Sequence, residues 1–211
     1  MSAAAFDAGG RALASARGPA FAASTGGAYA LSARTGALAA TIAAAAPLFS
    51  FRWTSTTALC IVERIAVTVV IVTNITTSLT AAIEAVVARA FTGSDSSGTA
   101  ITLSGNNAKK RTDYATSVVG DARIANTSAL TAGTRTLDST AIGSVDYVTG
   151  TVGPNNVLVK TALYSYENSF DPIVLEADEG FVIRNVLTGP ADGTWRLAVD
   201  VAWVETAAYV P

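Results

Sequence analysis

Residues 194–203, TWRLAVDVAW, are the part of the sequence that best indicates the fold. Large apolar residues stand at every second position, with small or charged residues between them: Trp195, Leu197, Val199, Val201 and Trp203. Successive side chains of a strand point to opposite faces, so this alternation predicts a half-buried β-strand. A surface platform of tryptophans for sugars is the alternative, but the regular aliphatic spacing favours a place in the core.

The chain from residue 47 onward has a composition that is also typical of strands. Val, Ile and Thr dominate it, and Gly, Asn, Asp and Ser mark the breaks. Short strands with turns at this spacing are typical of sandwiches and barrels. We predict an all-β fold, an antiparallel jelly-roll or β-sandwich, with strands at 48–53, 59–72, 99–103, 157–164, 173–175, 181–183 and 195–203.

Two apolar segments, residues 65–72 and 79–91, lack the clear alternation of residues 194–203. Residues 65–72 do not alternate, which predicts a strand covered on both faces, and Cys60 just before them reads as a small buried hydrophobe. Residues 79–91 fit either a helix, from the spacing of their apolar residues, or one face of a strand. We favour the strand because the surrounding sequence is all strand-like and tertiary context overrides local propensity.

The first 46 residues differ from the rest. They are mostly Ala, Gly, Ser and Thr with widely spaced large side chains, and their charged residues sum to +2. Such a segment buries little apolar surface by itself. We predict two parts: an N-terminal arm over 1–46, extended or partly helical, that lies along another subunit, and a β-sandwich domain over 47–211. A disordered terminus, or an Ala-rich helix near 37–46, is the alternative.

The overall composition excludes several classes of protein. The chain of 211 residues has a net charge of −2 and one cysteine, so a disulfide scaffold is excluded and nucleic acid is not the expected partner. It contains no histidine, the commonest general base and metal ligand. We therefore expect no catalytic, cofactor-binding or metal-binding residues, and a structural or binding role in place of an enzyme.

Targeting signals are not evident in the sequence. Asp7, Arg11 and Arg17 interrupt the first residues in an order unlike that of a secretory signal. The apolar runs near 37–49 and 65–72 are too short to span a membrane. We expect a soluble protein without an export signal and without a membrane partner.

The carboxyl half resembles a known group of proteins. Residues 172–175, 179–185 and 195–205 are similar to the closing strands of jelly-roll proteins in tailed-bacteriophage particles, and residues 88–92, 109–111 and 130–134 look like the same group. The resemblance covers about residues 48–207. It implies a virion component, a capsid decoration (cement) protein that is made in the host cytoplasm and sits on the capsid surface. The group has no catalytic motif to carry over.

The expected partners are therefore the major capsid protein and neighbouring copies of the chain, in a homo-oligomer for which a trimer fits a lattice. The candidate contacts are cationic and aromatic residues of the arm and the single basic run: Arg11, Arg17, Phe21, Tyr29, Arg34, Lys109, Lys110 and Arg111. For the basic run, a solvated loop is the favoured alternative. The acidic turn with Glu176, Asp178 and Glu179 is read as solvated, with calcium binding as the lesser alternative.

Two other functions stay open at this stage. A carbohydrate- or receptor-binding component of a head fibre or tail predicts exposed aromatic residues in a groove, for which the candidates are Tyr147, Tyr164, Tyr166 and Phe170. An enzyme such as a cupin or a carboxylate-dependent glycosidase is the least favoured. Cupin metal sites use histidines, and no spacing singles out a carboxylate pair.

Overall fold

The computed structural model describes residues 26–39, 41–77, 79–149, 154, 160–168 and 172–207. Within them the regular elements are nearly all strands, and the exception is the 3-10 helix η1 (Tyr166–Asn168). The strands are β1 (Gly27–Arg34), β2 (Pro47–Trp53), β3 (Leu59–Thr73), β4 (Leu79–Arg89), β5 (Thr99–Ala100), β6 (Val119–Ile124), β7 (Thr136–Leu137), β8 (Gly143–Thr149), β9 (Thr161–Ser165), β10 (Ile173–Leu175), β11 (Glu179–Asn185) and β12 (Thr194–Thr206).

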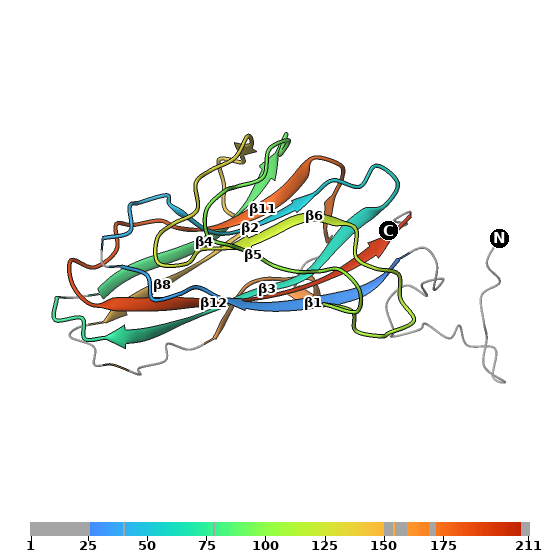
Figure 1. The fold of residues 1–211 in the computed structure, drawn as a ribbon. Coiled ribbons are helices and arrows are strands. Elements are labelled where there is room, and N and C mark those ends of the chain that lie inside the picture. The colour runs from blue at the N-terminus through green and yellow to red at the C-terminus, as the bar shows by residue number, and fades with distance from the viewer. Residues whose placement is uncertain are drawn as a thin grey trace, which may run out of the picture.

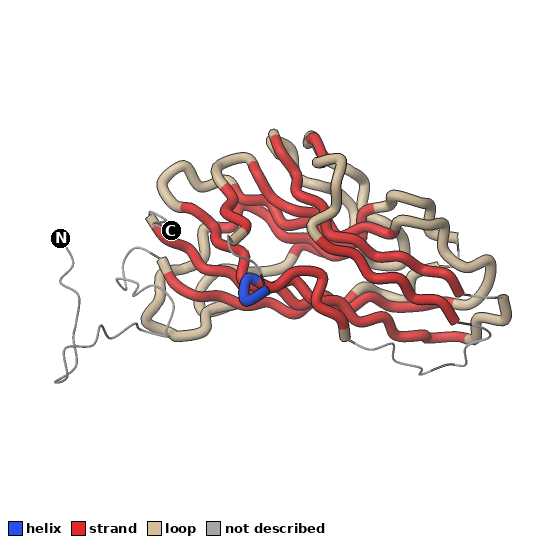
Figure 2. Tube along the Cα trace, turned by 180° about the vertical axis from the view of Figure 1, so that it is seen from behind, coloured by secondary structure: helices blue, strands red, loops and turns tan. Residues whose placement is uncertain are grey.

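The described strands form two antiparallel sheets that pack face to face as a sandwich (Figure 1). Sheet 1 has the order β1-β12-β3-β10, with β9 also paired to β3. Sheet 2 has the order β5-β6-β2-β11-β4-β7, with β8 also paired to β4. The view from behind shows η1 beside the strands of sheet 1, after the end of β9 (Figure 2). The prediction of an all-β antiparallel sandwich is confirmed.

The core lies between the two sheets and is rich in aromatic rings. Trp203 of sheet 1 meets Phe51 of sheet 2 edge-on at 5.3 Å between ring centroids. Phe51 stacks on Phe181 at 5.0 Å, and Trp203 stacks on Tyr29 at 5.5 Å. These four side chains are fully buried, and such ring pairs add to the stabilisation from area burial alone. The core position expected for Trp195 and Trp203 is confirmed, as is the burial of Cys60.

Residues 79–89 form a strand, β4, as expected in place of a helix. Strands on both sides explain this outcome, because β4 pairs with β11 on one edge and with β8 and β7 on the other. The hydrogen bonds of two neighbouring strands override the helical preference of its Ala and Glu residues. The strands β6, β7 and β8 were not predicted.

The boundary predicted at residue 46 is not where the sandwich begins. Residues 27–34 form β1, which pairs with β12 from Gly27↔Glu205 to Arg34↔Ala198. Leu38 and Ile42 are also buried in the core. The described part of the predicted arm therefore belongs to the sandwich, because alternating side chains such as Tyr29 and Leu31 reach the core while small residues cover the other face. Residues 1–25 lie outside the described residues.

Part of the outer face of sheet 2 is covered by the segment that directly follows β4. Phe91 packs there on Ala88 and Val182 in a second, smaller apolar cluster. Arg52 of β2 fastens this segment by donating hydrogen bonds to the carbonyl oxygens of Phe91 at 2.5 Å and Thr92 at 2.7 Å. Sheet 2 is thus buried on both faces at these positions.

Candidate functional site

The outer face of sheet 1 carries the candidate site. The register aligns Ala30 of β1, Ala202 of β12, Arg64 of β3 and Ser165 of β9 in one row across the four strands. Their neighbours Tyr29, Trp203 and Ile65 point into the core. Residues aligned in this way share one face of a sheet. The row therefore presents two methyl groups, a guanidinium and a hydroxyl on the outer face.

A β-bulge places a second charge beside this row. The β12–β3 register jumps from Ala202↔Arg64 to Trp203↔Val62, so Glu63 is an extra residue without a partner opposite it. In a regular strand Glu63 and Arg64 would point to opposite faces. The bulge lets both remain partly exposed while Val62 and Ile65 are buried. Bulges commonly re-aim side chains in this way near functional sites.

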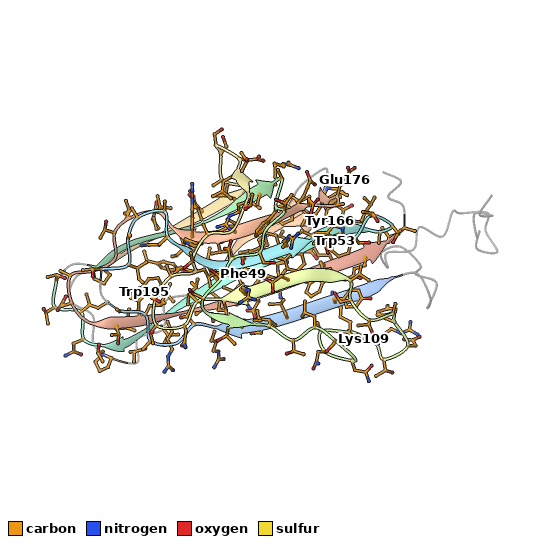
Figure 3. All side chains as sticks on the ribbon, turned by 45° about the horizontal axis from the view of Figure 1, so that its top comes forward. Phe49, Trp53, Lys109, Tyr166, Glu176 and Trp195 are labelled. Atoms are coloured by element: carbon orange, nitrogen blue, oxygen red, sulfur yellow. The ribbon has the colours of Figure 1, made fainter. Side chains whose placement is uncertain are left out.

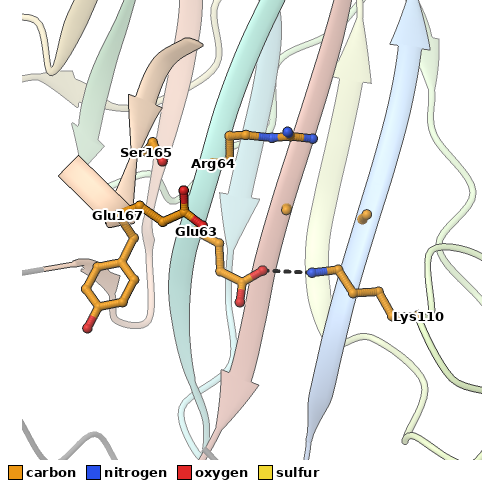
Figure 4. Close-up of a pocket in the computed structure, with 8 residues that line it drawn as sticks. Glu63, Arg64, Lys110, Ser165 and Glu167 are labelled. Carbon is orange, nitrogen blue, oxygen red and sulfur yellow. Dashed lines mark hydrogen bonds and ion pairs between the residues drawn. The ribbon is translucent and has the colours of Figure 1, made fainter. Parts of the chain in front are cut away.

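Two further segments, the 104–111 loop and η1, flank this row of residues on opposite sides. Lys110 comes from the 104–111 loop, which attaches to the edge of β1 through Ala30 N–H to Ala108 O (2.8 Å) and Lys110 N–H to Ala28 O (3.0 Å). Tyr166 and Glu167 come from η1, which follows β9. The resulting depression has a volume of about 340 Å³ (Figure 4). We call it the outer groove: Ala30, Glu63, Arg64, Lys110, Ser165, Tyr166, Glu167 and Ala202.

The charges of the outer groove balance. Lys110 Nζ donates to Glu63 Oε2 at 2.8 Å, across β12. Within the described part of the chain, no hydrogen bond or ion pair engages the side chains of Arg64 and Glu167. The groove thus contains one ion pair, Lys110 with Glu63. It also contains one cation, Arg64, and one anion, Glu167, whose hydrogen-bonding groups are not used by the described residues.

Asp200 lies on the same outer face, beside the groove. Burial would raise the pKa of Asp200, but hydrogen bonds from Lys160 and Ser32 and the positive charge of Arg64 together lower it below its ordinary value. Asp200 is therefore a carboxylate at neutral pH, and Arg64 faces an ionised neighbour.

The predicted basic run does not form a free basic patch. Lys110 is paired with Glu63, and Arg111 is paired with Asp113 at 2.6 Å. Lys109 Nζ donates to Asn106 Oδ1 at 3.3 Å. Figure 3 shows Lys109 on a loop at the periphery, away from Phe49 and Trp195 in the interior. Of the three, Lys110 lines the outer groove.

The predicted contacts of the arm separate into three groups. Tyr29 is fully buried, and its hydroxyl donates to Ala115 O at 2.8 Å, so it is a core residue and not an exposed contact. Burial chiefly raises the pKa of Tyr29 far above its ordinary value. Arg34 is exposed at the end of β1. Arg11, Arg17 and Phe21 lie outside the described residues.

The aromatic candidates also differ in exposure. Tyr147 is buried, and Tyr164 is half-buried with its hydroxyl accepting the Ile173 N–H at 2.9 Å. Tyr166 is 43% exposed and lines the outer groove. Phe170 lies outside the described residues.

Two of the three carboxylates of the acidic turn, those of Asp178 and Glu179, are engaged by neighbours. Glu179 pairs with Arg89 and also accepts the Glu176 N–H at 2.9 Å. Asp178 lies 3.5 Å from Arg52. Among the described residues, no group of three or more His, Cys, Asp or Glu is placed to hold a metal ion.

A second concave region lies at the end of the sandwich where the described chain begins and ends. Two depressions of about 310 and 350 Å³ share Ser55, Thr57, Ala58 and Ala207, and the first also includes Gly26. Val118, the most exposed large apolar residue of the described chain at 46%, lies there. We call this the end surface: Gly26, Ser55, Thr57, Ala58, Val118 and Ala207.

A buried carboxylate, that of Glu205, lies next to the residues of the end surface. Glu205 is 2% exposed and accepts hydrogen bonds from Ser117 Oγ (2.6 Å), Trp203 Nε1 (3.0 Å) and Val118 N–H (3.1 Å). Burial raises the pKa of Glu205, although these donors partly oppose the shift. Glu205 therefore ties the segment before β6 to β12.

Sequence reasoning did not single out Glu63, Arg64, Glu167 or Glu205. One signal was present: Glu63 and Arg64 are the only charged residues in the apolar run 59–72. In this strand the bulge is what lets two adjacent charged side chains both stay partly exposed.

The described residues include no helix that is both long enough and apolar enough for a membrane span. This chain matches no protein-family model, no curated protein and no solved structure.

Proposed function

We propose that this protein is a structural component of a virus particle, a capsid decoration protein whose sandwich is a jelly roll. The observation that carries the proposal is the order in which the strands pair. Viral capsid proteins, lectin domains and cupins are among the proteins that contain jelly rolls. Cupin metal centres use histidines, and this sequence contains none.

The strand order supports a jelly roll because eight strands pair as a nested hairpin. The first strand pairs with the last, β1 with β12, and the second with the next to last, β2 with β11. Further in, β3 pairs with β9 and β4 with β8. The hairpin is then rolled, so that β12 also pairs with β3 and β11 with β4. Four-stranded orders β1-β12-β3-β9 and β2-β11-β4-β8 result.

The end surface is the proposed site of attachment to the capsid. It is concave and holds the exposed Val118 among small Ser, Thr and Ala residues. Because residues 27–34 are strand β1 of the sandwich, the segment proposed to lie along a neighbouring subunit is reduced from residues 1–46 to residues 1–25. Many identical weak contacts on a repeating lattice raise the avidity of each copy.

The test is binding of the purified chain to preformed capsids that lack it. We expect deletion of residues 1–25 and the substitution Val118→Asp each to lower capsid occupancy, and the heat stability of the particle to fall with it. Leu187→Asp is the matched control, because Leu187 is 41% exposed but lies outside the end surface. Unchanged occupancy in both test variants would overturn the proposal.

A homo-oligomer is the proposed assembled state, with a trimer as the form that suits threefold positions of a lattice. Mass measurement in solution and on capsids tests this. A chain that is monomeric in solution and bound to capsids as isolated single copies contradicts contacts between neighbouring copies.

A further inference from the structure

We propose that the outer groove is a carbohydrate-binding site, separate from the end surface and independent of attachment to a capsid. The ligand class is a short, neutral oligosaccharide. In this proposal a sugar ring packs against Tyr166, while Arg64, Glu167 and Ser165 hydrogen-bond to its hydroxyl groups.

The first argument is the chemistry of the unused groups. Arg64 can only donate hydrogen bonds, ionised Glu167 can only accept them, and Ser165 can do both. They line one depression. A sugar presents vicinal hydroxyl groups that both donate and accept, so it can satisfy all three. A simple anion or a simple cation would leave one of the two charged groups unmatched.

The second argument is charge balance. Glu63 and Glu167 oppose Arg64 and Lys110, so the groove residues carry no net formal charge. Glu63 and Lys110 satisfy each other at 2.8 Å. This balance favours a neutral polar ligand over a nucleic acid or an acidic peptide, which would require excess positive charge.

The third argument is the shape of the groove. Ala30 is exposed and carries only a methyl group, so the floor of the groove is shallow at β1, beside the buried Ala202 with which it is paired. Tyr166 stands at the rim and is 43% exposed, with an apolar ring and a polar hydroxyl. A volume of about 340 Å³ lies near the lower end of ligand sites and suits about one or two sugar rings.

The backbone also holds the groove in place without a ligand. Arg64 and Glu63 are set by the bulge in β3, which is paired on both edges. Lys110 is held by the two main-chain hydrogen bonds that attach its loop to β1. Groups fixed in this way lose less conformational freedom when a ligand binds.

The experiment uses the full chain and a panel of neutral di- and trisaccharides of hexoses and N-acetylhexosamines. Saturation-transfer NMR identifies binders, and titration calorimetry gives their affinities. We expect Arg64→Ala and Tyr166→Ala each to weaken binding about tenfold or more, the effect of losing one good contact. Tyr166→Phe keeps the ring and is expected to retain most of the affinity.

Arg196→Ala is the matched control. Arg196 is an exposed arginine on the same outer face of β12, but it is paired with Val70 at the far end of the strand and does not line the groove. Its loss is expected to leave binding unchanged. Unfolding midpoints of all variants establish that they are folded. The proposal is overturned if the chain binds no saccharide of the panel, if Arg64→Ala and Tyr166→Ala bind normally, or if Arg196→Ala weakens binding as much as they do.

Discussion

The outer faces of the two sheets differ in how far other parts of the chain cover them. On sheet 2, Val182 and Ala88 point outward yet are fully buried, since Phe91 of the segment after β4 packs on them. On sheet 1, the outward residues Ser32, Arg64 and Arg196 are exposed, and the outward residues that are buried, Ala66 and Ala202, are small.

This contrast separates stability from function. The covered face of sheet 2 works as a second core, so its residues are expected to matter for folding. The open face of sheet 1 contributes little to stability, which leaves its side chains available to bind a ligand. Substitutions on the two faces test this division directly.

Phe91→Ala, on the covered face, is expected to lower the free energy of unfolding by about 4 kcal/mol, because it empties the cluster around Ala88 and Val182. It also removes the ring that the Arg135 guanidinium faces at 5.1 Å. Tyr166→Ala on the open face is expected to change it by less than about 0.5 kcal/mol. Urea unfolding of both variants measures the difference, and equal losses would contradict the division between the faces.

Asp95→Ala is expected to lower the free energy of unfolding by about 3 kcal/mol. Asp95 is 2% exposed, pairs with the buried side chain of Arg135 and accepts the Gly133 N–H at 2.8 Å. Its removal leaves a buried guanidinium without its counter-ion. Asp138→Ala breaks an exposed pair with Arg89 and serves as the control, with a loss below about 1 kcal/mol. If Asp138→Ala lowers the free energy of unfolding as much as Asp95→Ala does, burial does not explain the contribution of the Asp95–Arg135 pair.

Glu205→Gln tests a titrating group inside the sandwich, away from either outer face. Because the pKa of Glu205 is raised in the folded state, its contribution to stability is largest below the ordinary pKa of a glutamate and is lost as pH rises through the raised value. We expect the wild type to lose stability over this window relative to Glu205→Gln, whose side chain does not titrate there. The variant also disturbs one hydrogen bond, which adds an offset independent of pH. Unfolding free energies measured at several pH values separate the two, and parallel curves would contradict the assignment.

Lys110→Met probes the open face and is expected to change the free energy of unfolding by no more than about 1 kcal/mol. It removes a partly exposed ion pair with Glu63, whose side chains are 42% and 37% exposed. The effect is expected to shrink as salt is added. A larger, salt-independent loss would mean that the 104–111 loop stabilises sheet 1 as a cover does, which would weaken the contrast between the faces.

Much of the fold was predictable because strand patterning is local. The alternation in 194–203 identifies β12, and the apolar run 59–72 identifies β3, since a strand's period of two is written in consecutive residues. Strand β1 escaped prediction because its outward residues are as small as those of the preceding segment. Alternation of Tyr29 and Leu31 was the available sign.

The candidate site was much less predictable, because its residues come from distant parts of the chain. Lys110 and Glu63 are 47 positions apart and meet across β12. For the basic run, the sequence favours a solvated loop over a capsid contact, but it does not reveal the partners of the side chains: Lys110 pairs with the distant Glu63 and Arg111 with the nearby Asp113. Tyr166 and Lys110 were both named as candidates and are both exposed at the groove.

Composition and local pattern were thus enough to establish a β-rich chain without histidine chemistry, with its tryptophans and Cys60 inside. Each of these properties depends on residue type or on neighbours within a few positions. The place of 27–34 beside β12, the bulge that turns Glu63 outward and the choice of which sheet stays open required the folded chain. The pairing of strands far apart in the sequence depends on the free energy of the whole sandwich, and the sequence of a single segment does not determine it.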